Sequence, residues 1–186
     1  MTEIITKTIE VLESSGTIIY PTDTIWGIGC DATNFEAVSN VYSIKKRAES
    51  KSMLILVNSQ EMLNKYVKSV PNIAYELINV IQGPLTIVYP NGKNLAKNLF
   101  APDGSIGIRI SKSDFCNELI ETFNKPIVST SANIAGIKNP LGFFDIANEI
   151  KEAVDYIVPL NLEQLSPRRS SDIIKVKMSG EIEIIR

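Results

Sequence analysis

The segment at residues 53–57, MLILV, is apolar throughout and lies between polar stretches. Short continuous apolar runs of this kind are typical of strands that are covered on both faces, as in an α/β sheet. The same argument and period-two alternation predict further strands at residues 17–20, 85–89, 106–110, 127–129, 156–158, 172–176 and 181–185. The last two are joined by the turn residues 178–180 and are expected to form a hairpin.

Segments with helical spacing of apolar residues alternate with these strands. Ile5, Ile9 and Leu12 mark the buried stripe of a first helix, and Asn34 is placed to cap the next one. Further helices are predicted from Ser59 to about residue 67, from Pro71 to residue 81, over residues 114–123 with Ser111 as the cap, and over residues 143–153. We therefore expect one α/β domain over residues 1–186, built on a twisted, open, mixed β-sheet flanked by helices.

The side-chain inventory excludes several kinds of chemistry. The chain has no histidine, and Cys30 and Cys116 form no C-x-x-C pair. A zinc site of Cys and His, a Ser-His-Asp or Cys-His nucleophile and an imidazole base are therefore excluded. We expect reduced thiols and a cytoplasmic protein, because the N-terminal helix is acidic rather than signal-like and no apolar run approaches the ~20 residues of a membrane span. A net charge of −2 argues against wholesale coating of nucleic acid but allows a local basic patch.

Residues 20–32, YPTDTIWGIGCDA, form the first candidate site. Pro21 cannot donate a backbone hydrogen bond, so strand pairing is expected to stop there and the following loop to face a ligand. The loop offers the hydroxyls of Thr22 and Thr24 and the ring of Trp26, although the sequence does not say which threonine points inward. Its glycines match the dinucleotide pattern G-x-G-x-x-A only weakly, since neither the preceding strand nor the following helix adjoins them.

The basic residues Lys45, Arg47 and Lys51 follow at the end of the next predicted helix. They could be a solvated helix terminus, where cations are favourable in any case. They could also form a clamp for a polyphosphate, in which arginine supplies a fork of donors and lysine a point charge. The sequence contains no GK[ST] and hence no Walker loop.

The turn after the strand at residues 127–129 carries Ser129, Ser131 and Asn133 within the sequence STSAN. Loops at the carboxyl ends of α/β strands are where ligands bind, and a helix cap with a turn explains only one or two of these polar groups.

Three further positions carry polar groups beside apolar strands. Thr86 ends the sequence GPLT, and Arg109 lies in the middle of the strand IGIRI, where a buried or cavity-lining position competes with a solvent-facing one. Arg168 and Arg169 stand before the final hairpin and, taken alone, suggest a solvated loop.

Taken in order, these motifs resemble one family. YPTDTIWGIGCDA, KKRAESKSML, GPLT, IGIRI, STSAN, RRSSDI and the terminal IIR are together similar to the YrdC/TsaC family of threonylcarbamoyl-AMP synthases in its short, single-domain form. The resemblance runs from about residue 18 to residue 186. It implies a twisted open sheet with a concave, positively lined cavity.

The resemblance also implies a reaction. L-threonine, bicarbonate or CO2, and ATP with its Mg²⁺ condense to threonylcarbamoyl-adenylate with release of pyrophosphate, without a protein-bound metal or organic cofactor. Other proteins then transfer the threonylcarbamoyl group to adenosine 37 of tRNAs. The chemistry needs positioning and neutralisation of phosphate charge rather than a histidine base, which fits the inventory.

Residue roles follow from the same resemblance. Lys45 and Arg47 would be catalytic and, with Lys51, Ser131, Asn133 and Arg186, would bind ATP and its phosphates. Threonine or the adenylate would contact Thr22, Thr24, Trp26, Thr86, Arg109, Ser129 and Ser171. Trp26 stands where the family usually has tyrosine or phenylalanine.

Two alternatives stay open at this point. One is a YciO-like paralogue that shares most of the motifs. The other is a ribosome-associated or RNA-binding factor of the same fold, for which weak tRNA binding would fall steeply with salt.

Overall fold

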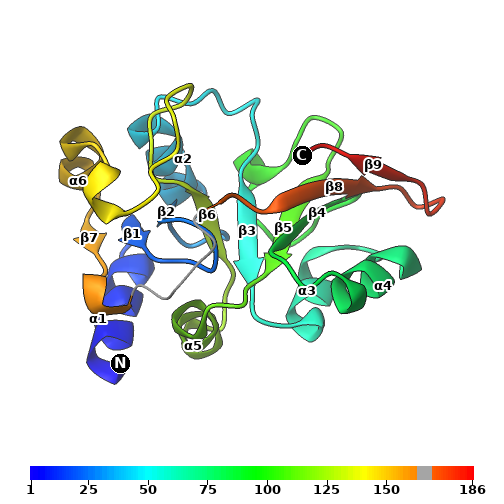
Figure 1. Ribbon diagram of the computed structural model, residues 1–186, viewed down its shortest axis with the longest axis horizontal. Helices are drawn as coiled ribbons and strands as arrows, with labels where there is room; N and C mark the ends of the chain where they lie inside the picture. Colours follow the sequence, from blue (N-terminus) through cyan, green and yellow to red (C-terminus); the bar gives the residue numbers. More distant parts are fainter. Residues whose placement is uncertain (163–168) are drawn as a thin grey trace.

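A computed structural model describes residues 1–162 and 169–186. Within these residues, nine strands form one sheet in the order β7-β1-β2-β6-β3-β5-β4-β8-β9 (Figure 1). Their bounds are β1 Ile18–Tyr20, β2 Gly27–Gly29, β3 Leu54–Val57, β4 Leu85–Tyr89, β5 Ile106–Ile110, β6 Ile127–Ser131, β7 Tyr156–Ile157, β8 Asp172–Val176 and β9 Ile182–Ile184.

The sheet is mixed, as predicted. β1 pairs with β7, β3 with β5 and β4 with β8 in parallel, and the other five neighbouring pairs are antiparallel. Parallel neighbours require crossover connections, and the helices supply them. The predicted α/β class with an open mixed sheet is confirmed.

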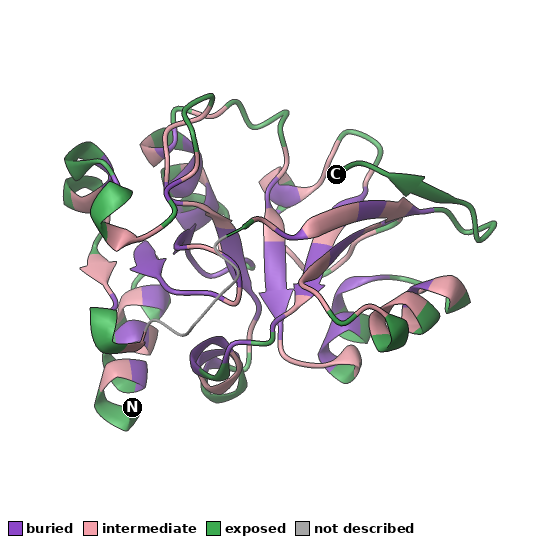
Figure 2. Cartoon of the chain, viewed as in Figure 1, coloured by how far each residue is buried: buried purple, intermediate pink, exposed green. Residues whose placement is uncertain are grey.

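Helices surround this sheet. Their bounds are α1 Thr2–Glu13, α2 Phe35–Ile44, α3 Gln60–Tyr66, α4 Asn72–Val80, α5 Asp114–Phe123 and α6 Asn148–Ala153, with 3₁₀ turns at Lys97–Leu99, Phe143–Asp145 and Leu160–Leu162. α3 and α5 pack on β3, and α1 contacts β1 and α5. The central strands are buried, while the outer sides of the helices and strand β9 are exposed (Figure 2).

Alternation along β5 separates the core from the opposite face of the sheet. Ile106 and Ile108 are almost completely buried in the apolar core, whereas Gly107 and Arg109 point to the other side. Arg109 pairs in register with Leu56 of β3 and Thr86 of β4. The sheet therefore presents one polar face in the middle of the molecule.

The predicted loop over residues 20–32 is wrong in one part, because β2 forms inside it. Gly27–Gly29 pairs with both β1 and β6. A Cβ on Gly29 would lie only 2.4 Å from the carbonyl oxygen of Val128 and 2.6 Å from the Tyr20 ring, so this glycine permits close strand and ring packing. The G-x-G pattern thus serves sheet packing, and only residues 21–26 form the connecting loop.

Two other boundaries also differ from the prediction. The N-cap of α5 is Ser113, whose hydroxyl accepts from the backbone N–H of Cys116, while the Ser111 hydroxyl accepts from the N–H of Ser113. The helix predicted over residues 143–153 is interrupted, because the chain is extended at Ile146 and Ala147 between the 3₁₀ turn and α6.

Candidate functional site

A cavity of about 540 Å³ lies on the polar face of the sheet. Its floor comes from β2, β6, β3, β5, β4 and β8, and its rim from the segments after α2 and β6 and from the two residues after β9. Its volume falls in the range of ordinary small-molecule sites.

The cavity gathers all but one of the predicted site residues. Those that line it are Thr24, Trp26, Lys45, Arg47, Lys51, Thr86, Arg109, Ser129, Ser131, Asn133, Ser171 and Arg186. Thr22 does not line it. The Thr22 hydroxyl donates to the carbonyl of Ile25 and accepts from the backbone N–H of Thr24, so it shapes the loop that presents Thr24.

The charge of the cavity is one-sided. Five cationic side chains line it, namely Lys45, Arg47, Lys51, Arg109 and Arg186, and no acidic residue is among the described residues that do. The whole chain carries a net charge of −2, so the positive charge is concentrated locally. Such a cavity favours an anionic ligand.

Lys45 connects the two motifs at the rim. It is 1% exposed, and its ammonium donates to the carbonyl oxygens of Ser131 and Asn133, the latter at 2.8 Å, and to Asn133 Oδ1 at 3.3 Å. The Lys45 carbonyl in turn accepts from the N–H of Ala135. The end of α2 and the segment after β6 are therefore held together around one buried cation.

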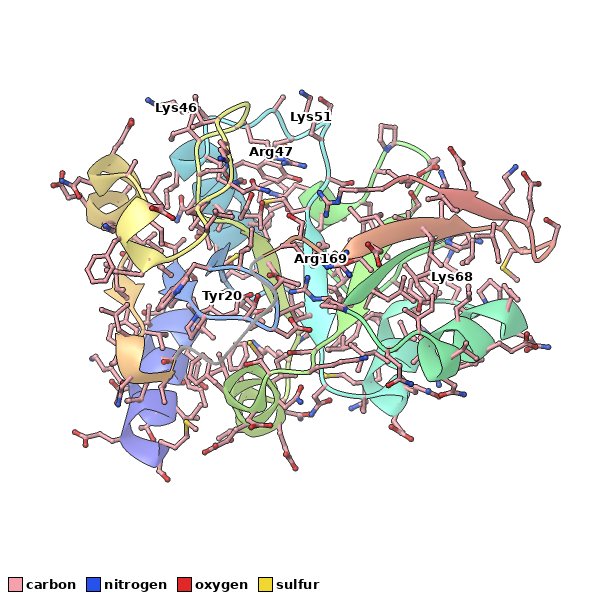
Figure 3. All side chains as sticks on the ribbon, viewed as in Figure 1. Tyr20, Lys46, Arg47, Lys51, Lys68 and Arg169 are labelled. Carbon is pink, nitrogen blue, oxygen red and sulfur yellow. The ribbon has the colours of Figure 1, made fainter. Side chains whose placement is uncertain are left out.

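The end of α2 explains where Arg47 points. Lys46 adopts a left-handed conformation with φ of 49°, and the N–H groups of Lys46 and Arg47 donate to the carbonyls of Ser43 and Tyr42. This is the hydrogen-bond pattern of a Schellman motif, with lysine in place of the usual glycine. The chain reverses there, and Figure 3 shows Lys46, Arg47 and Lys51 along the segment that follows α2.

Arg47 organises this segment. Its Nε donates to the carbonyl of Lys51 at 2.7 Å and its Nη2 to the carbonyl of Ser52 at 2.8 Å. The exposed Lys51 lies on the same turn and at the cavity rim. The three basic residues thus occupy one side of the cavity, as the clamp hypothesis requires.

Burial alters the acidity of two of these cations. Desolvation, with a further contribution from the neighbouring Arg47 charge, lowers the pKa of Lys45 to about 7. Desolvation also lowers the pKa of Arg47. An anion in the cavity would favour the charged form of both groups and raise these pKa values again.

Ser131 and Asn133 form a short polar chain beside Lys45. The Ser131 hydroxyl donates to Asn133 Oδ1, and Asn133 Nδ2 donates to the carbonyl of Ile137. β6 extends to Ser131, two residues beyond the strand predicted over residues 127–129, so Ser131 lies on a strand instead of in the predicted turn. Both serines consequently face the cavity two residues apart.

A second polar cluster lies across the floor. The hydroxyls of Thr86 and Ser171 are 2.7 Å apart, and both residues are almost completely buried. Arg186 donates through Nε and Nη2 to the carbonyl of Ser171, at 3.2 and 3.0 Å. The final residue of the chain therefore closes this side of the cavity.

Arg109 is buried on the cavity floor. Its Nη2 lies 3.1 Å from Oδ1 of Asp23, and the two side chains are 4% and 6% exposed. Arg109 Nε has no hydrogen-bond partner. Asp23 was not among the predicted site residues, because its partner Arg109 lies far along the chain and meets it only in the folded protein.

Trp26 forms an aromatic wall. It is 2% exposed, lines the cavity, and its ring packs on Phe143 with centroids 5.1 Å apart. The Lys151 ammonium lies 4.7 Å from the Phe143 ring centroid on the outer side. Trp26 is consequently held in place and contributes an edge to the cavity.

Arg169 does not line the cavity. Arg169 is exposed and lies 3.7 Å from Asp172, and Figure 3 shows it in the middle of the view. Arg168 falls outside the described residues.

Within residues 1–162 and 169–186 there is no group of three or more acidic or cysteine side chains that could hold a metal ion. No described helix has the length and apolar character needed to cross a membrane.

Comparison with known proteins places the chain in a family. A model of the Sua5/YciO/YrdC domain, described as "Telomere recombination", matches residues 10–186. The threonylcarbamoyl-AMP synthase of Pseudoalteromonas translucida (strain TAC 125) is 29% identical over 181 residues, which are 96% of this chain and 95% of that protein. The threonylcarbamoyl-AMP synthase of Hahella chejuensis (strain KCTC 2396) is 31% identical over 163 residues, 87% of this chain and 89% of that protein.

Solved structures share the fold. P. abyssi Sua5 complexed with L-threonine superposes with a TM-score of 0.84 at 24% identity, covering 92% of this chain and 50% of the other. E. coli YciO superposes with a TM-score of 0.86 at 21% identity, covering 100% of this chain and 89% of the other. The chain thus spans about half the length of P. abyssi Sua5 and nearly the whole length of the two synthases named above. It belongs to the Sua5/YciO/YrdC family.

Proposed function

We propose that this protein is an L-threonylcarbamoyladenylate synthase, a nucleotidyltransferase that condenses L-threonine, bicarbonate or CO2, and ATP. The proposal rests above all on the cavity, which five cations line without any described acidic residue, and in which Lys45 joins the segment that carries Arg47 to Ser131 and Asn133. Family membership and the threonylcarbamoyl-AMP synthases at about 30% identity support it. P. abyssi Sua5, a structure of the same fold, binds L-threonine.

The phosphates of ATP are assigned to the side of the cavity that carries Arg47 and Lys51. Arg47 and Lys51 would neutralise the negative charge that shifts toward the leaving pyrophosphate, and Lys45 would hold the Ser131–Asn133 segment against the nucleotide. Mg²⁺ enters as part of the substrate with ATP, because the described lining residues include no carboxylate to ligate it.

The reaction balances without a protein nucleophile. The threonine amine, as the free base, forms a bond to the carbon of CO2, and its surplus proton passes to solvent. A carbamate oxygen then bonds to the α-phosphorus while the bond from this phosphorus to the bridging oxygen breaks, and pyrophosphate leaves. The protein contributes orientation and charge stabilisation, which explains how a chain with no histidine could catalyse it.

The product would be passed on. From the family resemblance, we assign its use to separate proteins that transfer the threonylcarbamoyl group to adenosine 37 of tRNA. Because a mixed anhydride of this kind hydrolyses readily, the transfer has to be prompt. Weak tRNA binding near the exposed Lys51 at the cavity rim would shorten the distance that the product has to diffuse.

Pyrophosphate release tests the proposal. The wild-type protein with Mg-ATP and bicarbonate should release pyrophosphate only when L-threonine is added. Lys45→Ala and Arg47→Ala should each abolish this release, whereas the matched control Lys68→Ala should retain it, because Lys68 is exposed, does not line the cavity and lies away from Arg47 and Lys51 in Figure 3. Release that is indifferent to threonine contradicts the proposal.

A further inference from the structure

Asp23 lies outside the cavity lining but is fixed directly behind it. It stands between Thr22 and Thr24 in the loop that joins β1 and β2, and its side chain is 6% exposed. Oδ1 lies 3.1 Å from Arg109 Nη2, and Oδ2 accepts a hydrogen bond from the backbone N–H of Lys112 at 3.2 Å. One carboxylate thus ties the loop after β1 to Arg109 of β5 and to Lys112 in the segment that follows β5.

This carboxylate holds Arg109 in one orientation and leaves part of it unsatisfied. Arg109 is 3% exposed and lines the cavity floor, yet its Nε has no hydrogen-bond partner. Nε is itself inaccessible to solvent, so a ligand can reach only the part of the guanidinium that lines the cavity. A carboxylate ligand fits there, because guanidinium donors match its geometry.

The charge on Arg109 also differs from that of the other cavity cations. Arg109 is paired with Asp23, whereas Lys45, Arg47, Lys51 and Arg186 form no ion pair with an acidic residue within the described residues. The Arg109–Asp23 pair is therefore close to neutral overall, whereas Arg47 and Lys51 keep their positive charge. A polyphosphate is drawn to these uncompensated cations, and a zwitterion with one carboxylate suits the compensated Arg109.

We propose that Asp23 is a positioning residue that orients Arg109 for the carboxylate of the amino-acid substrate and, by compensating its charge, keeps phosphate groups on the other side of the cavity. This inference rests on the proposed function, because it takes an amino acid as the ligand. Asp23 itself touches neither substrate nor reacting atoms. It acts through Arg109.

Binding measurements on Asp23→Asn test this role. Asparagine keeps the size of the side chain and an acceptor for the Lys112 N–H, but it removes the negative charge. We expect the affinity for L-threonine, titrated calorimetrically in the presence of a non-hydrolysable ATP analogue, to fall about tenfold or more. Inorganic tripolyphosphate should bind at least as tightly as to the wild type. The matched control is Asp103→Asn, which removes a surface carboxylate paired with Lys175 and should change neither affinity.

The outcomes separate this inference from the proposed function. Unchanged threonine affinity in Asp23→Asn, or an equal loss for threonine and tripolyphosphate, overturns the role of Asp23 alone. Absence of threonine binding by the wild-type protein overturns both.

A second measurement needs no variant at residue 23. The Nε–Hε resonance of Arg109, assigned by its disappearance in Arg109→Lys, should shift in the wild-type protein when L-threonine is added and stay in place with tripolyphosphate. The reverse pattern, or no shift with threonine, overturns the inference even if Asp23→Asn fails to fold.

Discussion

The ammonium of Lys45 donates to both the backbone carbonyl and the side-chain oxygen of Asn133, at 2.8 and 3.3 Å. The two residues are 88 positions apart and belong to the two motifs that were predicted to bind the nucleotide. Lys45 therefore holds the site together as well as contributing charge to it. Removing this side chain should disturb both the phosphate side and the Ser131–Asn133 segment.

The pH dependence of stability should report on Lys45. Its pKa is about 7 in the folded protein and near the ordinary 10.5 in the unfolded chain, so from about pH 7 upward the unfolded state binds a proton that the folded state lacks. The free energy of unfolding should therefore rise with pH between about 7 and 9, by at most about 1.4 kcal/mol per pH unit from this group. Above that range, buried tyrosines with raised pKa values oppose it.

Urea unfolding of Lys45→Met against wild type at pH 7, 8 and 9 checks this expectation. Methionine keeps most of the apolar stem but cannot be protonated. The wild-type protein should gain stability relative to the variant as the pH rises. A constant difference would mean that Lys45 stays charged in the folded protein across this range.

Arg47 should not be replaceable by lysine. Its guanidinium holds the carbonyls of Lys51 and Ser52 at the same time, and a single ammonium cannot reproduce that fork. Arg47→Lys should weaken ATP binding about tenfold or more while leaving the affinity for threonine within about twofold. Equal losses for the two ligands in calorimetric titrations would show that the change spreads beyond the phosphate side.

The Thr86–Ser171 hydroxyl pair should be strongly coupled. Thr86→Val leaves the buried Ser171 hydroxyl without its 2.7 Å partner and should cost about 1–3 kcal/mol of unfolding free energy. Ser171→Ala should have a similar effect. Thr86→Val with Ser171→Ala should cost less than the sum, since no orphan hydroxyl remains. Additive losses in a urea-unfolding cycle would argue against the pair.

Lys46 should carry a backbone cost that glycine relieves. It is left-handed, with φ of 49°, at the end of α2, and its surface ion pair with Glu149 contributes little. Lys46→Gly and Lys46→Ala both lose the ion pair, so their difference isolates the backbone. The glycine variant should be more stable than the alanine variant by about 1 kcal/mol in thermal or urea unfolding. Equal stability would place the strain elsewhere.

The order of helices and strands was largely accessible from periodicity, because short apolar runs such as residues 53–57 and 106–110 between polar stretches are typical of buried strands. β2 was missed for a physical reason. Gly27–Gly29 has low intrinsic strand propensity, and it becomes a strand only because β1 and β6 pair with it on both sides.

Within the site, the sequence predicted which residues line the cavity better than it predicted the hydrogen bonds that each of them makes. Thr22 and Thr24 are equivalent in the sequence, and only the loop geometry sends Thr24 to the cavity while Thr22 bonds to the carbonyl of Ile25. Asp23 could not be recognised as a site residue from the sequence, since its role depends on an ion pair with Arg109. Arg109 is 86 residues further along the chain, and the fold alone brings the two side chains together.

Product analysis by mass spectrometry is the most direct test of whether this protein makes threonylcarbamoyl-adenylate. The protein is incubated with Mg-ATP and ¹³C-bicarbonate, once with L-threonine and once without it. We predict a labile adenylate that contains threonine and the ¹³C label, formed with pyrophosphate only in the first mixture and absent with Lys45→Ala. Pyrophosphate or an adenylate in equal amounts without threonine, or AMP alone in both mixtures, would contradict it.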